Sequence, residues 1–143
     1  MISIKPIKKS DYNKILLIEQ NLFKDPMSQI ELNNFISQSA FRIWKIEKDR
    51  IFGYVSFFQV IDEIEIIKIG IMKPYQRSSY GSILIDEIKK LDIKKIFLEV
   101  SVQNKNAINF YLKNGFQKIG IRKGYYANDK SSRIDALRLC VKL

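Results

Sequence analysis

The chain contains no histidine and a single cysteine, Cys140. Without histidine, a Ser-His or Cys-His nucleophile is excluded, and acid-base chemistry falls to carboxylates, tyrosine, lysine, water or the backbone. Zinc sites are built mostly from His and Cys, so no metal is expected. One cysteine cannot form an internal disulfide, and its place in the alternating segment ALRLCVKL predicts a buried side chain.

Long apolar runs are also missing, and none approaches the roughly 20 residues that a membrane span requires. The segment MISIKPIKKSDYNK lacks the apolar stretch of a signal peptide, so we expect a cytoplasmic protein without membrane contact. Internal repeats and Pro/Gly/Ser-rich linkers are absent, and the range 1–143 therefore predicts one domain.

Basic residues outnumber acidic ones by 25 to 15, which gives a net charge of +10. This charge favours an anionic ligand or a nucleic-acid-rich partner such as a ribosome. It also follows from a bias toward Lys and Ile, with lysines spread over solvated faces. The second interpretation is favoured, because no long block of consecutive basic residues occurs.

The hydrophobic pattern predicts the order β-α-α-β-β-β-α-β-α-β-β, which describes a mixed α/β sheet rather than a doubly wound one. Ser10 is expected to cap a helix over 11–23, and the spacing of Ser28 to Glu31 is that of a capping box. Gly115 stands where a helix ends in a left-handed residue. Strands are expected at 2–7, 41–47, 51–60, 63–71, 94–102, 117–123 and 135–143. Further helices are expected from near Gly81 and over 104–116.

Residues 75–82, YQRSSYGS, join an apolar strand to an amphipathic helix. The start of a helix presents free N–H groups and a positive dipole end, so this turn is suited to bind an anion. Arg77 adds charge, and the serines offer hydroxyl donors. The same residues also fit an ordinary β-to-α connection, and the local pattern leaves both interpretations open.

Glu99 interrupts the apolar segment IFLEV, where a buried strand is expected. Burial of an unpaired carboxylate is costly and raises the pKa of such a group, which suits a general base. Alternatively, Glu99 faces a solvated side of the sheet or pairs with a lysine. Glu65 in IEII raises the same question one strand earlier, and the pattern does not rank the two.

Tyr111 lies on the stripe of the 104–116 helix that faces the sheet. A tyrosine packed in the core is the simpler interpretation. Its hydroxyl is also suited to act as an acid toward a leaving group of similar pKa, such as a thiolate.

Together, YQRSSYG, LEV and NKNAINFYLKNGF resemble the GNAT superfamily of N-acetyltransferases, whose loop motif is Gln/Arg-x-x-Gly-x-Gly/Ala. The later motif Asn-x-x-Ala-x-x-x-Tyr-x-x-x-Gly-Phe is matched by Asn104, Ala107, Tyr111, Gly115 and Phe116. IEQNLFKDPMS, DEIEIIKIGI and IRKGYYANDKSSRIDALRLCVKL further resemble the RimI-type enzymes, which acetylate the N-terminal alanine of a small-subunit ribosomal protein. The resemblance spans essentially the whole chain. It implies the GNAT acyl-CoA N-acyltransferase fold, with a mixed, mostly antiparallel sheet of about seven strands and about four helices.

The resemblance also implies a role for each matching position. Glu99 would accept a proton and Tyr111 would donate one, in a direct transfer from acetyl-CoA within a ternary complex. The residues implied to contact acetyl-CoA are Ile69, Gly70, Ile71, Gln76, Arg77, Ser78, Ser79, Tyr80, Gly81, Ser82 and Asn104. Those implied to lie near the acceptor peptide are Glu65, Tyr125 and Tyr126.

Ser79 departs from the motif, because it stands where the first loop glycine falls. If this position needs a positive φ, serine costs about 1 kcal/mol relative to glycine. If the backbone is ordinary, the hydroxyl adds a phosphate contact instead. We expect a working loop, because Gln76, Arg77 and Gly81 are all in place.

The expected partners are acetyl-CoA and the N-terminus of a ribosomal protein, with no requirement for direct nucleic-acid binding and with a monomer or weak dimer as the working form. One alternative is acetylation of a small amine, a polyamine or a lysine side chain, against which the YY…DAL tail argues. Another is a non-catalytic acyl-CoA- or ribosome-binding module, in which Glu99 would have no function.

Overall fold

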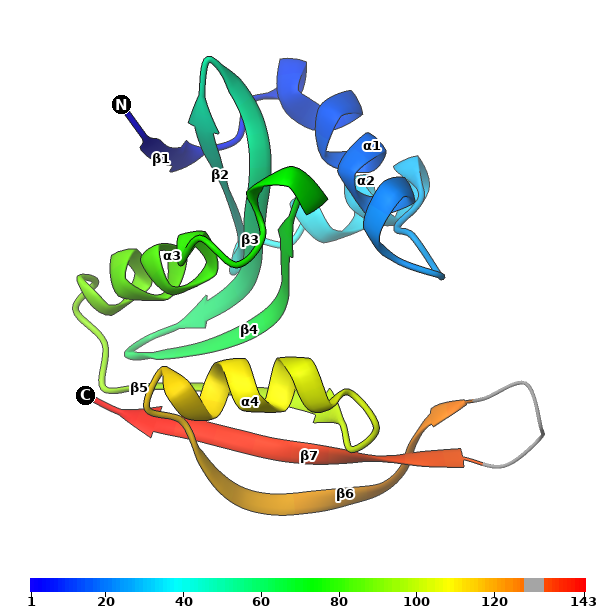
Figure 1. Cartoon of the computed structure of the whole chain (residues 1–143), viewed down its shortest axis with the longest axis vertical. Coiled ribbons are helices and arrows are strands. Elements are labelled where there is room, and N and C mark those ends of the chain that lie inside the picture. Colours follow the sequence, from blue (N-terminus) through cyan, green and yellow to red (C-terminus); the bar gives the residue numbers. More distant parts are fainter. Residues whose placement is uncertain (128–132) are drawn as a thin grey trace.

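The computed structural model describes residues 1–127 and 133–143. Within these residues it shows a seven-stranded sheet of order β1-β2-β3-β4-β5-β7-β6 (Figure 1). Its strands are β1 (Ser3–Pro6), β2 (Phe41–Lys48), β3 (Arg50–Val60), β4 (Glu63–Ile71), β5 (Lys95–Ser101), β6 (Gln117–Ala127) and β7 (Arg133–Lys142). The pair β4 and β5 is parallel and the other pairs are antiparallel, so the predicted mixed sheet is confirmed.

The described helices are α1 (Tyr12–Leu22), α2 (Gln29–Ile36), α3 (Tyr80–Lys89) and α4 (Lys105–Lys113), with 3₁₀ turns at Lys9–Asp11 and Lys73–Tyr75. They follow the predicted order along the chain. None of these helices is long and apolar enough to cross a membrane. Residues 128–132 of the tail that resembles the RimI-type enzymes lie outside the described part.

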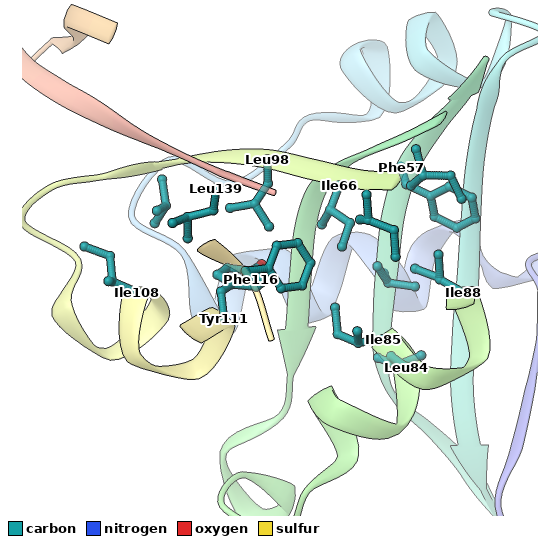
Figure 2. Packing of buried hydrophobic residues seen from close by; sticks show 14 of the residues in the cluster. Phe57, Ile66, Leu84, Ile85, Ile88, Leu98, Ile108, Tyr111, Phe116 and Leu139 are labelled. Carbon is teal, nitrogen blue, oxygen red and sulfur yellow. The ribbon is translucent and has the colours of Figure 1, made fainter. Parts of the chain in front are cut away.

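Helices pack on both faces of the sheet. Along β3, Tyr54 joins a cluster with Ile15 and Ile18 of α1, whereas its neighbours Val55 and Phe57 join the main core. This alternation follows from the period of a strand, whose successive side chains point to opposite faces. The main core also takes side chains from α3, α4, β4, β5 and β7 (Figure 2): Leu84, Ile85, Ile88, Ile108, Tyr111, Ile66, Leu98 and Leu139.

The predicted cap of the first helix is wrong. Ser10 lies inside the 3₁₀ turn that precedes α1, and no side-chain cap bond is formed there. The residue at the start of α1 is Asp11, and its carboxylate accepts the N–H of Lys8 at 2.8 Å rather than an N–H of the helix.

Two other local predictions at helix ends are confirmed. Ser28 and Glu31 form the capping box at the start of α2, with bonds of 3.1 and 3.2 Å. Gly115 takes the left-handed conformation beyond α4, with φ of +91°. Cys140 is also buried, as its alternating segment predicts.

The sheet opens between β4 and β5. These strands pair only at their beginnings, Glu63–Glu65 with Lys95–Phe97. Farther along β4 a bulge occurs, because Ser56 pairs with Lys68 and Phe57 with Ile66, so that Ile67 is the extra residue. The backbone of the second half of β4 is therefore free of β5, and the candidate site lies at this opening.

Candidate active site

A cleft of about 680 Å³ lies beside the second half of β4, between the start of α3 and one side of α4. Most of the residues implied to bind acetyl-CoA line it: Ile69, Ile71, Gln76, Arg77, Ser79, Tyr80, Gly81 and Ser82. Tyr75, Asn106, Phe110 and Lys113 also line the cleft, and sequence reasoning missed them. Gly70 and Ser78 are not among its lining residues. A Cβ at Gly70 would lie 2.9 Å from the ring of Tyr54, so the lack of a side chain there serves packing.

The loop before α3 has left-handed backbone at two non-glycine residues, Arg77 with φ of 63° and Ser79 with φ of 67°. Ser79 thus adopts the conformation that suits a glycine, and the cost considered above applies to it. Its side chain makes no cap bond to α3. Arg77 adds a second strained position that sequence reasoning did not foresee.

The start of α3 offers free donors to this cleft. The first bond of the helix runs from the N–H of Ile83 to the carbonyl of Ser79, at 3.0 Å. The N–H groups of 80–82 therefore have no partner within the helix, and they lie at the positive end of its dipole. Together with the exposed cation of Arg77, they form a site suited to a phosphate group.

Packing holds the loop in this shape. A Cβ at Gly81 would lie 2.9 Å from the ring of Phe110, so only glycine lets α4 approach this closely. The side chain of Gln76 donates to the carbonyl of Ile71 at 2.8 Å. In addition, Tyr75 stacks on a buried ring of β3, that of Phe52, with 4.2 Å between centroids. The donors of the loop are thus preorganised rather than mobile.

A second cavity, of about 250 Å³, shares Ile69, Ala107 and Tyr111 with the cleft. Glu99 and Tyr126 line this second cavity. Asn104, implied to touch the cofactor, lines it as well, and its side chain accepts the N–H of Ala107 at 3.2 Å to cap α4. The two cavities thus adjoin at Tyr111, Ile69 and Ala107.

Glu99 is not an unpaired buried carboxylate. Its side chain is 13% exposed and lies 3.2 Å from Nη1 of Arg122 and 3.7 Å from Nε of Arg138. The alternative of an ion pair with lysine is thus wrong in the residue type, because the partners of Glu99 are arginines. Tyr126 donates a long hydrogen bond to the Glu99 carbonyl, at 3.4 Å.

Glu65 and Tyr125 lie beside the second cavity rather than in its lining. Glu65 pairs in register with Phe97, two positions before Glu99 on the same face of β5. Partial burial raises the pKa of Glu65, and the charge of Glu99 raises it further. Tyr125 is 46% exposed, with the Arg122 guanidinium 4.6 Å from its ring centre.

Tyr111 is buried where α4 meets the core, next to Phe116 (Figure 2). Its ring also contacts that of Phe110. Burial, aided by the neighbouring Tyr126, raises the pKa of Tyr111 well above its usual value. Burial likewise raises the pKa of Tyr126 to about 12, with smaller contributions from Tyr125 and Glu99. Both hydroxyls therefore stay protonated at neutral pH and are available as donors.

Sequence reasoning also missed a buried ion pair between Glu19 of α1 and Lys68 of β4, at 3.1 Å. Lys68 lines the second cavity together with Phe23. Two signals pointed to the pair: Glu19 lies four residues after Ile15, on the buried stripe of its helix, and Lys68 interrupts the apolar segment IIKIGI.

A sheet that opens between two parallel strands, with a loop suited to phosphate on one side and a carboxylate and a tyrosine lining the opening, is the arrangement of an acetyl-CoA-dependent N-acetyltransferase. The chain belongs to the acetyltransferase (GNAT) family, whose profile matches residues 9–116. The expectation from the loop and the Asn104–Phe116 motif is thereby confirmed.

Curated relatives show which members of the GNAT family this chain resembles. The [ribosomal protein bS18]-alanine N-acetyltransferase of Haemophilus influenzae is 29% identical over 141 residues, which cover 96% of each chain. The enzyme of the same name from Escherichia coli is 25% identical over 147 residues, covering 100% of this chain and 99% of that one. The similarity to the RimI-type enzymes is thus confirmed over the whole length.

Solved structures agree with this placement. The crystal structure of the Escherichia coli ribosomal-protein-S18-alanine N-acetyltransferase matches 99% of this chain and 94% of that one, with a TM-score of 0.86 and 25% identity. Spermidine N-acetyltransferase from Vibrio cholerae, solved with CoA and spermine, covers 99% and 95% with a TM-score of 0.80 at 20% identity. At 20% identity, the similarity to the spermidine enzyme shows a shared fold and says nothing of the substrate.

Proposed function

We propose that this enzyme transfers the acetyl group of acetyl-CoA to the N-terminal α-amino group of a protein that begins with alanine, a ribosomal protein of the small subunit. The observation that carries the proposal is the meeting of two cavities at Tyr111, with Glu99 in the lining of the second. The full-length similarity to bS18-alanine N-acetyltransferases supports the choice of acceptor.

The first cavity suits acetyl-CoA, which supplies an activated acetyl thioester. Arg77 and the free N–H groups of 80–82 would bind the pyrophosphate, because the arginine supplies a positive charge and the N–H groups supply hydrogen-bond donors at the same end of the cleft. The backbone of 69–71 lies along the opening of the sheet and would bind the pantetheine arm. Its N–H groups are suited to stabilise the oxyanion that develops at the carbonyl.

Glu99 would accept the proton of the incoming ammonium, directly or through a water molecule. An N-terminal amine has a pKa of about 8, so a modest base is sufficient. Arg122 and Arg138 hold the carboxylate in one position at the cavity. The amine would then attack the thioester directly, so the absence of a Cys-His pair is no obstacle.

Tyr111 would donate to the departing sulfur. Its raised pKa keeps the phenol protonated through the neutral range. The same raised pKa makes it a weaker acid than a free phenol, so its contribution is the hydrogen bond given as charge develops on sulfur, ahead of full proton transfer. We further propose that the chain acts as one domain in the cytoplasm, as a monomer or weak dimer, and without nucleic acid.

The test is incubation with acetyl-CoA and peptides that start with alanine, serine or methionine, followed by mass spectrometry. Each alanine peptide is paired with a copy whose N-terminus is already blocked but which retains a lysine. We expect one acetyl group on the free alanine peptide and none on its blocked copy. If lysines or polyamines react while free alanine peptides do not, the acceptor is a different amine and the proposal fails.

A further inference from the structure

Lys68 of β4 and Glu19 of α1 form an ion pair beside the second cavity, and the mechanism above gives this pair no role. Nζ of Lys68 lies 3.1 and 3.2 Å from the two carboxylate oxygens of Glu19. Glu19 is 1% exposed, and it also accepts from the hydroxyl of Tyr54 at 2.7 Å and the N–H of Met27 at 3.2 Å. The carboxylate is thus bonded from several sides, which holds the lysine ammonium in one place.

The cationic end of this pair borders the cavity. The Lys68 side chain is 32% exposed and lines the cavity, and its ammonium lies 4.3 Å from the ring centre of Phe23. An ammonium has three N–H donors, of which the two oxygens of Glu19 occupy at most two. Since Glu19 is enclosed, an acceptor that enters the cavity meets the positive end of the pair.

The lining of the cavity carries few charges. Of the described residues that line it, Lys68 and Glu99 are the charged ones. The carboxylate of Glu99 is engaged by Arg122 and Arg138. The lining therefore combines one carboxylate paired with arginines and one fixed ammonium, and the carboxyl group of Glu65 lies outside it.

We propose that Lys68, positioned by Glu19, is a specificity-determining residue that excludes polyamines from the acceptor cavity. The inference rests on the proposed function, because it takes this cavity as the acceptor site. A polyamine that presents one amine to Glu99 carries its next ammonium a few methylene groups away, within or at the mouth of a cavity of about 250 Å³. Two like charges repel far more strongly in such a partly buried site than in water.

An N-terminal alanine meets no such penalty. Next to its reacting amine it carries a methyl group and an amide carbonyl, both uncharged. The carbonyl oxygen is an acceptor for the remaining N–H of Lys68. The same lysine thus favours a peptide N-terminus while it disfavours a polyamine, and specificity arises from this difference.

The test compares acetyl transfer to an alanine-starting peptide with transfer to spermidine. Lys68→Met keeps the apolar stem but removes the charge, whereas Lys68→Arg keeps the charge. Because Lys68→Met leaves Glu19 buried without its cation, the double variant Glu19→Gln/Lys68→Met repeats the test with a neutral pair. Lys118→Met, at an exposed position of β6 outside both cavities, is the matched control.

We expect kcat/KM for spermidine, relative to the peptide, to rise about 10- to 100-fold in both variants that carry Met at position 68. The ratio should stay within about twofold of the wild-type value in Lys68→Arg and Lys118→Met. An unchanged ratio in the double variant, with wild-type Tm and acetyl-CoA affinity, overturns the proposal, as does an equal rise in Lys68→Arg. A wild-type enzyme that acetylates no alanine peptide contradicts the proposed function instead, and spermidine turnover across the same variants still decides the role of Lys68.

Discussion

Arg122 donates to both carboxylate oxygens of Glu99, at 3.2 and 3.3 Å, across the width of the intervening strand β7. The proposed base is therefore held by its neighbours and not set alone in an apolar core. We therefore expect catalysis to depend on the position of this carboxylate more than on its burial.

Replacement of Glu99 by glutamine should slow acetyl transfer by about 10²- to 10⁴-fold, because an amide cannot accept the proton of the ammonium. Acetyl-CoA affinity should be nearly unchanged, since Glu99 lies outside the cofactor cleft. Steady-state kinetics and calorimetric titration with acetyl-CoA measure the two quantities. Glu63→Gln, at the exposed start of β4, is the control, and turnover of Glu99→Gln equal to that of this control removes Glu99 from the mechanism.

Tyr111→Phe should lower kcat by orders of magnitude while the Tm changes little, because the ring keeps its contacts with Phe110 and Phe116. If the hydroxyl serves sulfur departure, a thioester with a more acidic thiol as leaving group should lose less rate than acetyl-CoA does. Equal loss with both thioesters would show that the hydroxyl acts at another step.

Arg77→Ala should weaken acetyl-CoA binding by about tenfold, as expected for loss of one charge-assisted contact to phosphate. The loss should shrink as salt is raised, because ions screen an exposed cation. Titration at two ionic strengths measures this, with Arg50→Ala at the exposed start of β3 as the control. An unchanged Kd at low salt excludes a phosphate contact for Arg77.

Ser79→Gly should stabilise the fold by up to about 1 kcal/mol, which raises the Tm by about 3 °C, because glycine adopts a φ of 67° without strain. Ser79→Ala keeps the strain and should give no such gain. Thermal unfolding of both variants distinguishes the effect of backbone strain at position 79 from the effect of losing the hydroxyl. If Ser79→Ala binds acetyl-CoA as tightly as the wild type, the hydroxyl makes no phosphate contact, whereas weaker binding by both Ser79→Ala and Ser79→Gly assigns it one.

Glu65→Gln should stabilise the protein at neutral pH and have no such effect in acid. Burial raises the pKa of Glu65 in the folded state, so the folded protein binds this proton more tightly than the unfolded chain does. Stability from this group is therefore present below the ordinary carboxyl pKa and is lost as the pH rises through the raised value. Tm measured across this range should show a gap between variant and wild type that opens with increasing pH; a gap that opens toward acid would contradict the assignment.

Much of the fold could be predicted, because the signals for its helices and strands lie in residues that are close together in the sequence. The period of apolar residues gave the element order, the capping box gave the start of α2, and a lone Gly115 marked the end of α4. The cap at Ser10 failed because the chain before α1 forms a 3₁₀ turn, in which Asp11 bonds Lys8 and also Lys45, a residue of β2 that is distant in sequence.

The site residues were predicted unevenly. Arg77 and Gly81 lie in the loop motif and Tyr111 in the Asn104–Phe116 motif, and all three line the cleft. Asn104 belongs to the same motif as Tyr111 yet lines only the second cavity, where its side chain caps α4. Lys68 belongs to no motif, so its role depends on contacts with another part of the chain.

By itself, the sequence determined the class of chemistry and predicted the residues for it. The lack of histidine restricted the acid-base groups to side chains such as Glu99 and Tyr111, and the loop before α3 together with the Asn104–Phe116 motif indicated the phosphates of acetyl-CoA. Only the tertiary structure decided the environment of those residues. The motif raised a left-handed backbone at Ser79 as one alternative, and the structure decided that it occurs. The arginines beside Glu99 and the partner of Lys68 come from segments distant in sequence, so spacing alone does not identify which residues meet.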